Sequence, residues 1–193
     1  MNNPWLVLWI APRSWLRKRL DRQIKERTVL WLTLITGLLN GCVSVAARWG
    51  KYASLSIGRQ SGMIFRELIV GAIAAFLYLY LLSWAFQRVG RWLQGQGRYH
   101  DLYVAIGWSF YPWGITAIIG ILAFTLRNPA AQTLLGPIYF IVAIWSFVVS
   151  LKLLGEAHRF SVWRAFATFA IVLIAVVLCL IIISGIASLV RLI

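Results

Sequence analysis

Residues 102–126 of the chain read LYVAIGWSFYPWGITAIIGILAFTL and contain no charged residue. At about 1.5 Å per residue, a helix of this length crosses the roughly 30 Å hydrocarbon core of a bilayer. Pro112, near its middle, has no N–H for the carbonyl of Trp108, so we expect the helix to bend or break there. Because an unpaired carbonyl is costly in lipid, this span should be packed inside a bundle, where the hydroxyls of Ser109 and Thr116 can help.

The composition of the whole chain agrees with this interpretation. Hydrophobic residues make up 61% of the chain and charged residues only 12%, with a mean hydropathy of +0.81. A soluble globular domain carries about twice that share of charge. We therefore expect an integral membrane protein.

Five uncharged runs are long enough to span a bilayer, at about 28–47, 68–87, 102–126, 128–151 and 165–190. The last is longer than a perpendicular crossing needs, which predicts a tilted helix. The predicted fold class is all-α: a polytopic membrane protein with a five-transmembrane-helix bundle in a single membrane domain, 28–193. The longest connection, 48–67, contains three glycines and is predicted to be a loop, and 90–101 a flexible basic linker.

Residues 1–27 form a basic arm in front of the first span. Pro12 can open a helix, after which Leu16, Leu20 and Ile24 recur at spacing four on one face. Such a basic amphipathic helix with tryptophans is typical of a helix that lies in the membrane interface on anionic headgroups. The alternative is a docking helix for a protein partner. The residues expected to contact lipid or a partner are Trp5, Trp9, Arg13, Trp15, Arg17, Lys18 and Arg22.

The basic residues set the predicted topology. With the N-terminus inside, thirteen of the nineteen lysines and arginines lie on the inner side. The bias predicts a cytoplasmic N-terminus and an outer C-terminus. The net charge of +14 is better explained by these topology signals and by anionic lipid than by nucleic acid, so we expect no nucleic-acid partner.

Small and polar residues inside the spans indicate how helices meet. Gly37 and Gly41 form a Gly-xxx-Gly pair, which we expect to pack against a helix of the same chain rather than in a homo-oligomer, the alternative. Asn40 should bond across to another helix. None of the five runs contains an ionisable residue, which argues against a proton-coupled pump.

Two tryptophans lie deeper than the rest. Trp108 and Trp145 fall at about the same depth of antiparallel spans, and we expect their rings to pack together or to line one cavity. If irregular backbone at Pro112 borders a cavity, it forms an intramembrane groove. The residues predicted for this groove are Asn40, Trp108, Tyr111, Pro112, Trp113 and Trp145.

No pattern of catalytic or metal-binding residues is present. Glu156, His158 and Arg159 form a polar inner turn, where we expect Glu156 and Arg159 to pair. The chain has only two histidines, neither with a second ligand nearby in sequence, so we predict no metal site, no cofactor and no enzyme.

Three stretches of the chain share their order with a known family. They are the arm motif Asn3-Pro4-Trp5, Trp9, Pro12-Arg13 and Arg17; the segment from Gly95-Gln96-Gly97 to Gly107 and Tyr111-Pro112; and residues 145–165, WSFVVSLKLLGEAHRFSVWRA. Together they resemble the Yip family (Ypt/Rab-interacting membrane proteins), in its bacterial branch. The eukaryotic members have a long cytoplasmic N-terminal region in place of this short basic arm, so binding of a Rab GTPase is not carried over.

The resemblance implies a membrane-organising or trafficking-type scaffold that contacts lipids and partner proteins, and it supplies no catalytic site. It also implies a place in the cytoplasmic membrane of a bacterium, or in an internal membrane if the cell has one. The alternative is a small transporter, channel or lipid-moving protein that uses the groove at Pro112.

Overall fold

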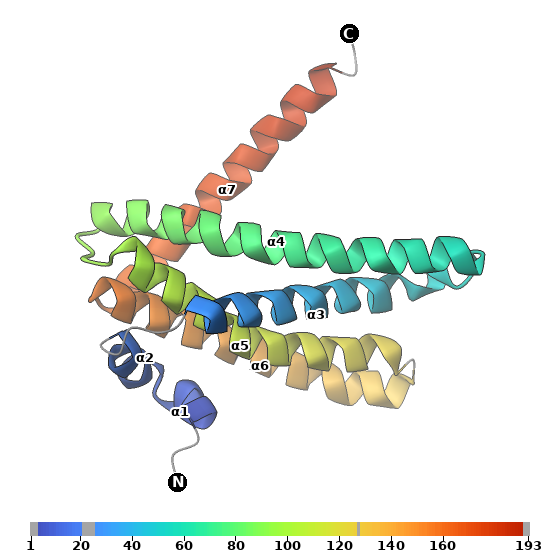
Figure 1. The fold of residues 1–193 in the computed structure, drawn as a ribbon, viewed down its shortest axis with the longest axis horizontal. Coiled ribbons are helices and arrows are strands. Elements are labelled where there is room, and N and C mark those ends of the chain that lie inside the picture. Colours follow the sequence, from blue (N-terminus) through green and yellow to red (C-terminus); the bar gives the residue numbers. More distant parts are fainter. Residues whose placement is uncertain (1–3, 21–25, 127, 191–193) are drawn as a thin grey trace.

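The structure, a computed structural model, describes residues 4–20, 26–126 and 128–190, and every regular element in them is a helix (Figure 1). Two short helices form the arm, α1 (Pro4–Ile10) and α2 (Pro12–Leu20). The five long helices are α3 (Glu26–Tyr52), α4 (Ile57–Trp92), α5 (Tyr99–Thr125), α6 (Pro129–His158) and α7 (Val162–Val190). Each of these five is long and apolar enough to cross a membrane. The predicted all-α, five-span fold is confirmed.

The long helices extend beyond the uncharged runs. The predicted loop over 48–67 is wrong, because α3 continues to Tyr52 and α4 begins at Ile57. No proline interrupts this stretch, and charged residues are good helix formers, so charge alone does not end a helix there. With 36 residues, α4 is about 54 Å long and exceeds the hydrocarbon core.

Helix α5 is the centre of the bundle, with α3, α4 and α6 packed around it. Residues 102–110 are buried without exception, which confirms that this span lies inside a bundle. Of the two outcomes predicted at Pro112, a bend or a break, the break is wrong, since α5 is one uninterrupted helix through this residue. The bend stays a prediction. Hydroxyl groups hold the backbone nearby: Thr36 of α3 donates to the Phe110 carbonyl at 3.1 Å, and Thr116 donates to the Pro112 carbonyl at 3.1 Å.

The Gly-xxx-Gly pair brings α3 and α4 into backbone contact. A Cβ at Gly37 would lie 2.8 Å from the Ala72 Cα, and one at Gly41 would lie 2.7 Å from the Glu67 carbonyl oxygen. Gly71 supplies the third small residue, because a Cβ there would overlap the Gly37 carbonyl. The predicted packing of this pair within one chain is confirmed.

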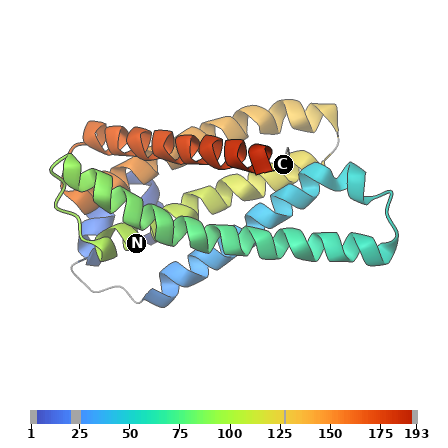
Figure 2. The same ribbon diagram turned by 90° about the horizontal axis from the view of Figure 1, so that it is seen from above.

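Helix α7 leaves the bundle that the other four long helices form. It begins beside α4 and α6, and Figures 1 and 2 together show its later turns inclined to them. Residues 173–182 are all exposed, so this part of α7 makes little contact with the described remainder of the chain. We call the end of the bundle with the arm, the 93–98 connection and the 159–161 turn the arm end, and the opposite end the far end.

Candidate functional site

The arm packs its apolar face onto the chain's own bundle. Leu8 and Leu16 are fully buried and Trp15 is 5% exposed. The Trp15 ring meets the Trp108 ring of α5 edge to face, with centroids 4.5 Å apart. The prediction that Trp15 contacts lipid or a partner is therefore wrong. Of the apolar face that the sequence assigned to the bilayer, Leu16 is covered by protein and Leu20 is half-buried, while Ile24 lies outside the described residues.

Arg19 lies against both rings of this pair. Its guanidinium carbon lies 4.6 Å from the Trp15 ring centroid and 4.5 Å from that of Trp108. A cation over two indole faces is attracted by both ring quadrupoles, each contributing roughly 0.5–1 kcal/mol or more where water is excluded. This contact of Arg19 was not predicted, because nothing in the sequence pairs residues 19 and 108.

Two further arm residues bind the polar turn after α6. Arg17 Nε donates to Glu156 Oε1 at 2.7 Å, and Arg13 Nη2 donates to the Phe160 carbonyl at 3.4 Å. The predicted pair of Glu156 with Arg159 is wrong, since Glu156 pairs with Arg17 instead. Arg159 is the left-handed residue that ends α6, with φ of 58°, and its side chain is exposed.

His158 is fully buried at the arm end and ties three segments together. Its Nε2 lies 3.1 Å from the Phe86 carbonyl of α4, and its ring stacks on Phe160 with centroids 4.8 Å apart. The 93–98 connection folds over the ring through glycines. A Cβ at Gly95 would lie 2.6 Å from Nδ1 and one at Gly97 2.8 Å from it, so neither position admits a side chain. His158 is therefore a packing residue.

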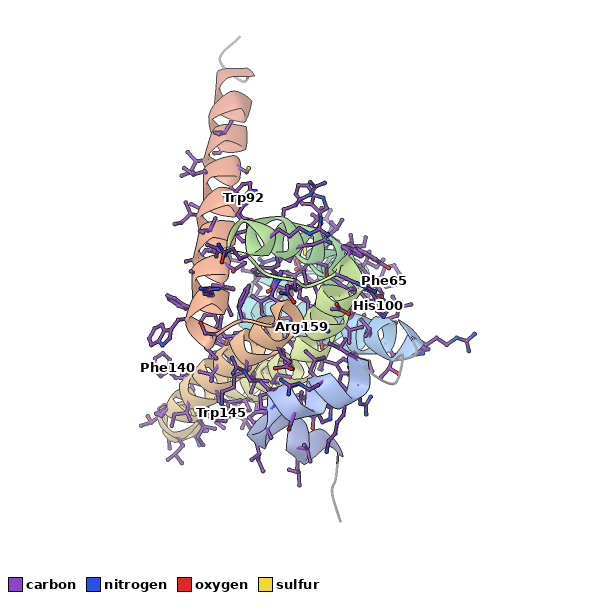
Figure 3. All side chains as sticks on the ribbon, turned by 90° about the vertical axis from the view of Figure 1, so that its left-hand side faces the viewer. Phe65, Trp92, His100, Phe140, Trp145 and Arg159 are labelled. Carbon is purple, nitrogen blue, oxygen red and sulfur yellow. The ribbon has the colours of Figure 1, made fainter. Side chains whose placement is uncertain are left out.

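The arm, the 93–98 connection and the end of α6 surround a polar hollow of about 910 Å³, which we call the arginine hollow. Figure 3 looks at this end of the molecule and shows Arg159 between the arm helices and the α4–α5 connection. Four arginines and only two carboxylates line it, so its charge is positive. The lining residues are Arg13, Arg17, Leu20, Gln96, Arg98, Asp101, Glu156, Ala157, Arg159 and Phe160.

Three other predicted arm residues, Trp9, Trp15 and Lys18, do not line the arginine hollow. Lys18 is exposed and Trp9 is half-buried. The Trp5 side chain and Arg22 lie outside the described parts of the chain.

A second hollow, of about 530 Å³, lies between α3, α4 and α5, and extends from the middle of these helices towards the far end. We call it the far-end groove. Of the six predicted groove residues, Asn40 and Trp113 line it. Its other lining residues include Thr36, Ser44, Glu67, Gly71, Ala74, Ala75, Tyr78, Ser109, Phe110, Thr116 and Tyr139.

The other predicted groove residues lie elsewhere. Trp108 and Trp145 do not pack together, because Trp108 is held against the arm while Trp145 is 39% exposed under the Lys152 ammonium. Figure 3 shows Trp145 on the outside of α6. Tyr111 packs against the bundle core and Pro112 is buried in α5.

An ion cluster at the edge of the far-end groove was missed. Glu67 is 7% exposed, and its Oε1 accepts from Arg48 at 2.9 Å, Arg66 at 2.8 Å and the Tyr52 hydroxyl at 3.2 Å. All four residues fall in the stretch 48–67, which was predicted to be a loop. The continuous helices place the Glu67 backbone beside Gly41, well inside the α3–α4 pair.

In the part of the chain that the structure describes, no three His, Cys, Asp or Glu side chains gather where they could hold a metal ion.

Comparison with known proteins supplies the family. The model of the Yip1 domain matches residues 5–184, which is nearly the whole chain. Searches of curated proteins and of solved structures returned no match.

Proposed function

The chain belongs to the Yip1 domain family, and from this premise we propose that it is a non-enzymatic membrane organiser that holds anionic phospholipid headgroups in its arginine hollow. It is an integral membrane protein with five apolar helices long enough to span a bilayer. The observation that carries the proposal is the excess of four arginines over two carboxylates around one hollow at the end of the bundle.

The geometry of the hollow supports a phosphate ligand. Arginine presents a planar fork of N–H donors that matches phosphate oxygens. Two of the four arginines are already oriented, Arg17 by Glu156 and Arg13 by the Phe160 carbonyl. Arg98 and Arg159 are exposed at the rim of the hollow. A headgroup that enters would meet both fixed and adaptable guanidinium groups.

The predicted topology places the hollow at the surface where anionic lipid is available. With the N-terminus inside, the arm end faces the cytoplasm of a bacterial cell, and a basic side chain near an anionic membrane surface contributes about 1 kcal/mol. We propose that the arm contributes to binding from its docked position on the bundle.

Retention of phosphatidylglycerol tests the proposal. The full chain, reconstituted with equal amounts of phosphatidylglycerol and phosphatidylcholine, is released into nonionic detergent and its retained lipids are counted by native mass spectrometry. We expect phosphatidylglycerol to be retained preferentially. Reversing two charges, with Arg98→Glu and Arg159→Glu, should reduce that retention at least about tenfold, since each charge contributes about 1 kcal/mol.

The matched control reverses two exposed charges at the far end, Lys51→Glu and Arg59→Glu. It changes the net charge equally and should leave retention unchanged. Equal loss of phosphatidylglycerol retention in the two double variants would contradict a specific site. Unchanged retention in the variant with Arg98→Glu and Arg159→Glu would contradict it too.

A second candidate function, movement of lipid or solute across the bilayer, is favoured by the far-end groove. Asn40 and Ser109 bring polar groups to this groove from two spanning helices. Vesicles that contain folded protein should then scramble a labelled lipid or release a trapped solute. Absence of any flux would leave the groove without a transport role.

A further inference from the structure

The far-end groove contains polar groups that have no hydrogen-bond partner among the described residues. The Asn40 amide nitrogen donates to the Thr36 carbonyl of its own helix at 2.9 Å, which leaves Oδ1 without a hydrogen-bond partner among the described residues. One turn along α3, the Ser44 hydroxyl also makes no hydrogen bond within that part of the chain. Both residues line the groove, and Asn40 is exposed to it. In hydrocarbon, such groups need an external partner.

The walls around these groups leave space for an apolar chain. On α4 the lining residues Gly71, Ala74 and Ala75 are small, and Ala74 is exposed. Aromatic side chains border the same space, from Phe110 and Tyr78 among others. A volume of about 530 Å³ lies within the range of roughly 300–1,000 Å³ that holds a small ligand. The groove therefore combines a polar end with an apolar lining.

The charges at the groove select a neutral ligand. Glu67 lines the groove, but its carboxylate already accepts from two guanidinium groups and one phenol. A cationic headgroup would compete with Arg48 and Arg66. An anionic headgroup would meet no guanidinium group in the lining, because Arg48 and Arg66 do not line the groove. A hydroxyl group meets neither difficulty, since it can donate to Asn40 Oδ1 and accept from Ser44.

We propose that the far-end groove binds one molecule of a neutral, hydroxyl-bearing, single-chain membrane lipid of the monoacylglycerol type. Its hydroxyls bond to Asn40 and Ser44, and its acyl chain lies along Gly71, Ala74 and Ala75. This site is independent of the arginine hollow, which lies at the arm end, shares no lining residue with the groove, and is proposed to bind anionic headgroups. It requires binding only, with no movement of the lipid.

Photolabelling tests this site directly. The full chain in phosphatidylcholine vesicles is irradiated with a monoacylglycerol that carries a diazirine on its acyl chain, and the adducts are mapped by mass spectrometry. We expect adducts on α4 and α5 residues that line the groove. Unlabelled monoacylglycerol should compete, whereas phosphatidylglycerol and an alkane of equal chain length should not. Adducts spread evenly over the exposed faces of α4 and α7 would overturn the proposal.

Three variants test whether photolabelling reports binding in the far-end groove. Asn40→Leu removes the polar partner and Ala74→Leu fills the space, so each should reduce labelling about tenfold, as expected for one or two lost hydrogen bonds or a blocked site. Ala47→Leu adds the same volume at an exposed position of α3 that does not line the groove, and should label like the unmodified chain.

Thermal unfolding of each variant separates loss of the site from loss of the fold. If Ala74→Leu does not fold, Ser44→Ala replaces it, because this change removes one hydroxyl and adds no volume. Labelling that is unchanged in folded Asn40→Leu and Ser44→Ala would also overturn the proposal.

Discussion

At the arm end, the arm covers charged and aromatic side chains of the bundle, whereas in the far-end groove polar side chains face an open hollow. Arg19 lies against both Trp15 and Trp108, and Arg17 is bound to Glu156. In the far-end groove, Asn40 is exposed beside a hollow of about 530 Å³. The same helices α3 to α6 form both ends, so the difference comes from what covers them.

The arm is what makes the two ends differ. It adds a buried apolar layer, through Leu8 and Leu16, to one end only. Helix α7 also packs against this end, because Phe169 stacks on Phe86 there. Residues 173–182 of α7 are exposed. We infer that the arm end fixes the bundle and that the far end is left accessible to lipid. The following predictions test that asymmetry, beginning with the largest effect.

Removing the central ring of the arm end should destabilise the protein most. Trp108 is 1% exposed, and truncation of a buried tryptophan to alanine costs about 3–5 kcal/mol. Trp108→Ala should therefore lower the unfolding temperature in detergent strongly. At the far end, Trp49 is 38% exposed, and Trp49→Ala should cost less than half as much. Equal losses of stability in the two variants would contradict the difference between the arm end and the far end.

Adding one methyl group at each end should produce a smaller difference in stability between the two ends. A Cβ at Gly90 would overlap the His158 ring, and overpacking of this kind costs about 1–3 kcal/mol. Gly50 has nothing within 4 Å of the same added atom. We expect Gly90→Ala to unfold at lower temperature, and Gly50→Ala to be unchanged or slightly stabilised because alanine favours the helix. A stable Gly90→Ala protein would contradict the tight packing around His158.

The ion pair that holds the arm should contribute less. Arg17 is 72% exposed, so its pair with Glu156 is worth about 1 kcal/mol or less. Arg17→Glu should increase the rate at which trypsin cleaves within the arm, and adding Glu156→Arg should restore the original rate. A double variant that is cleaved as fast as the single one would show that the two residues do not interact.

The far-end variant should have the smallest effect on stability. Asn40 is exposed and its amide bonds only within its own helix among the described residues, so Asn40→Leu should change the free energy of unfolding by about 0.5 kcal/mol or less. Chemical denaturation in detergent checks this. A loss of several kcal/mol would mean that Asn40 holds helices together, as the sequence alone suggests.

Much of the fold could be predicted from the sequence, because uncharged runs of sufficient length have few alternatives to spanning helices. The burial of residues 102–110 agrees with the prediction made from Pro112. Helix α5 is not broken at Pro112, where a hydroxyl on the neighbouring helix and one on α5 itself bond to nearby carbonyls. Helix ends were predicted poorly at 48–67, where charged residues fit either a loop or the extension of a long helix.

The sites could be predicted less well. An apolar stripe on the arm has the same pattern whether lipid or protein covers it, so the docking of Trp15 on Trp108 was not readable. The packing around His158 depends on glycines at 90, 95 and 97, which the fold alone brings to one ring. Glu67 escaped notice because its burial follows from helices that the sequence did not indicate.

A photo-crosslinking residue in place of Leu20 tests the docked arm most directly. Leu20 lines the arginine hollow together with Ala157 and Phe160. After irradiation of cell membranes, the account predicts two classes of adduct: peptides of the chain's own arm end, and anionic phospholipid. Adducts to a different protein, with none to the chain's own arm end, would contradict both the docked arm and the function proposed for the arginine hollow.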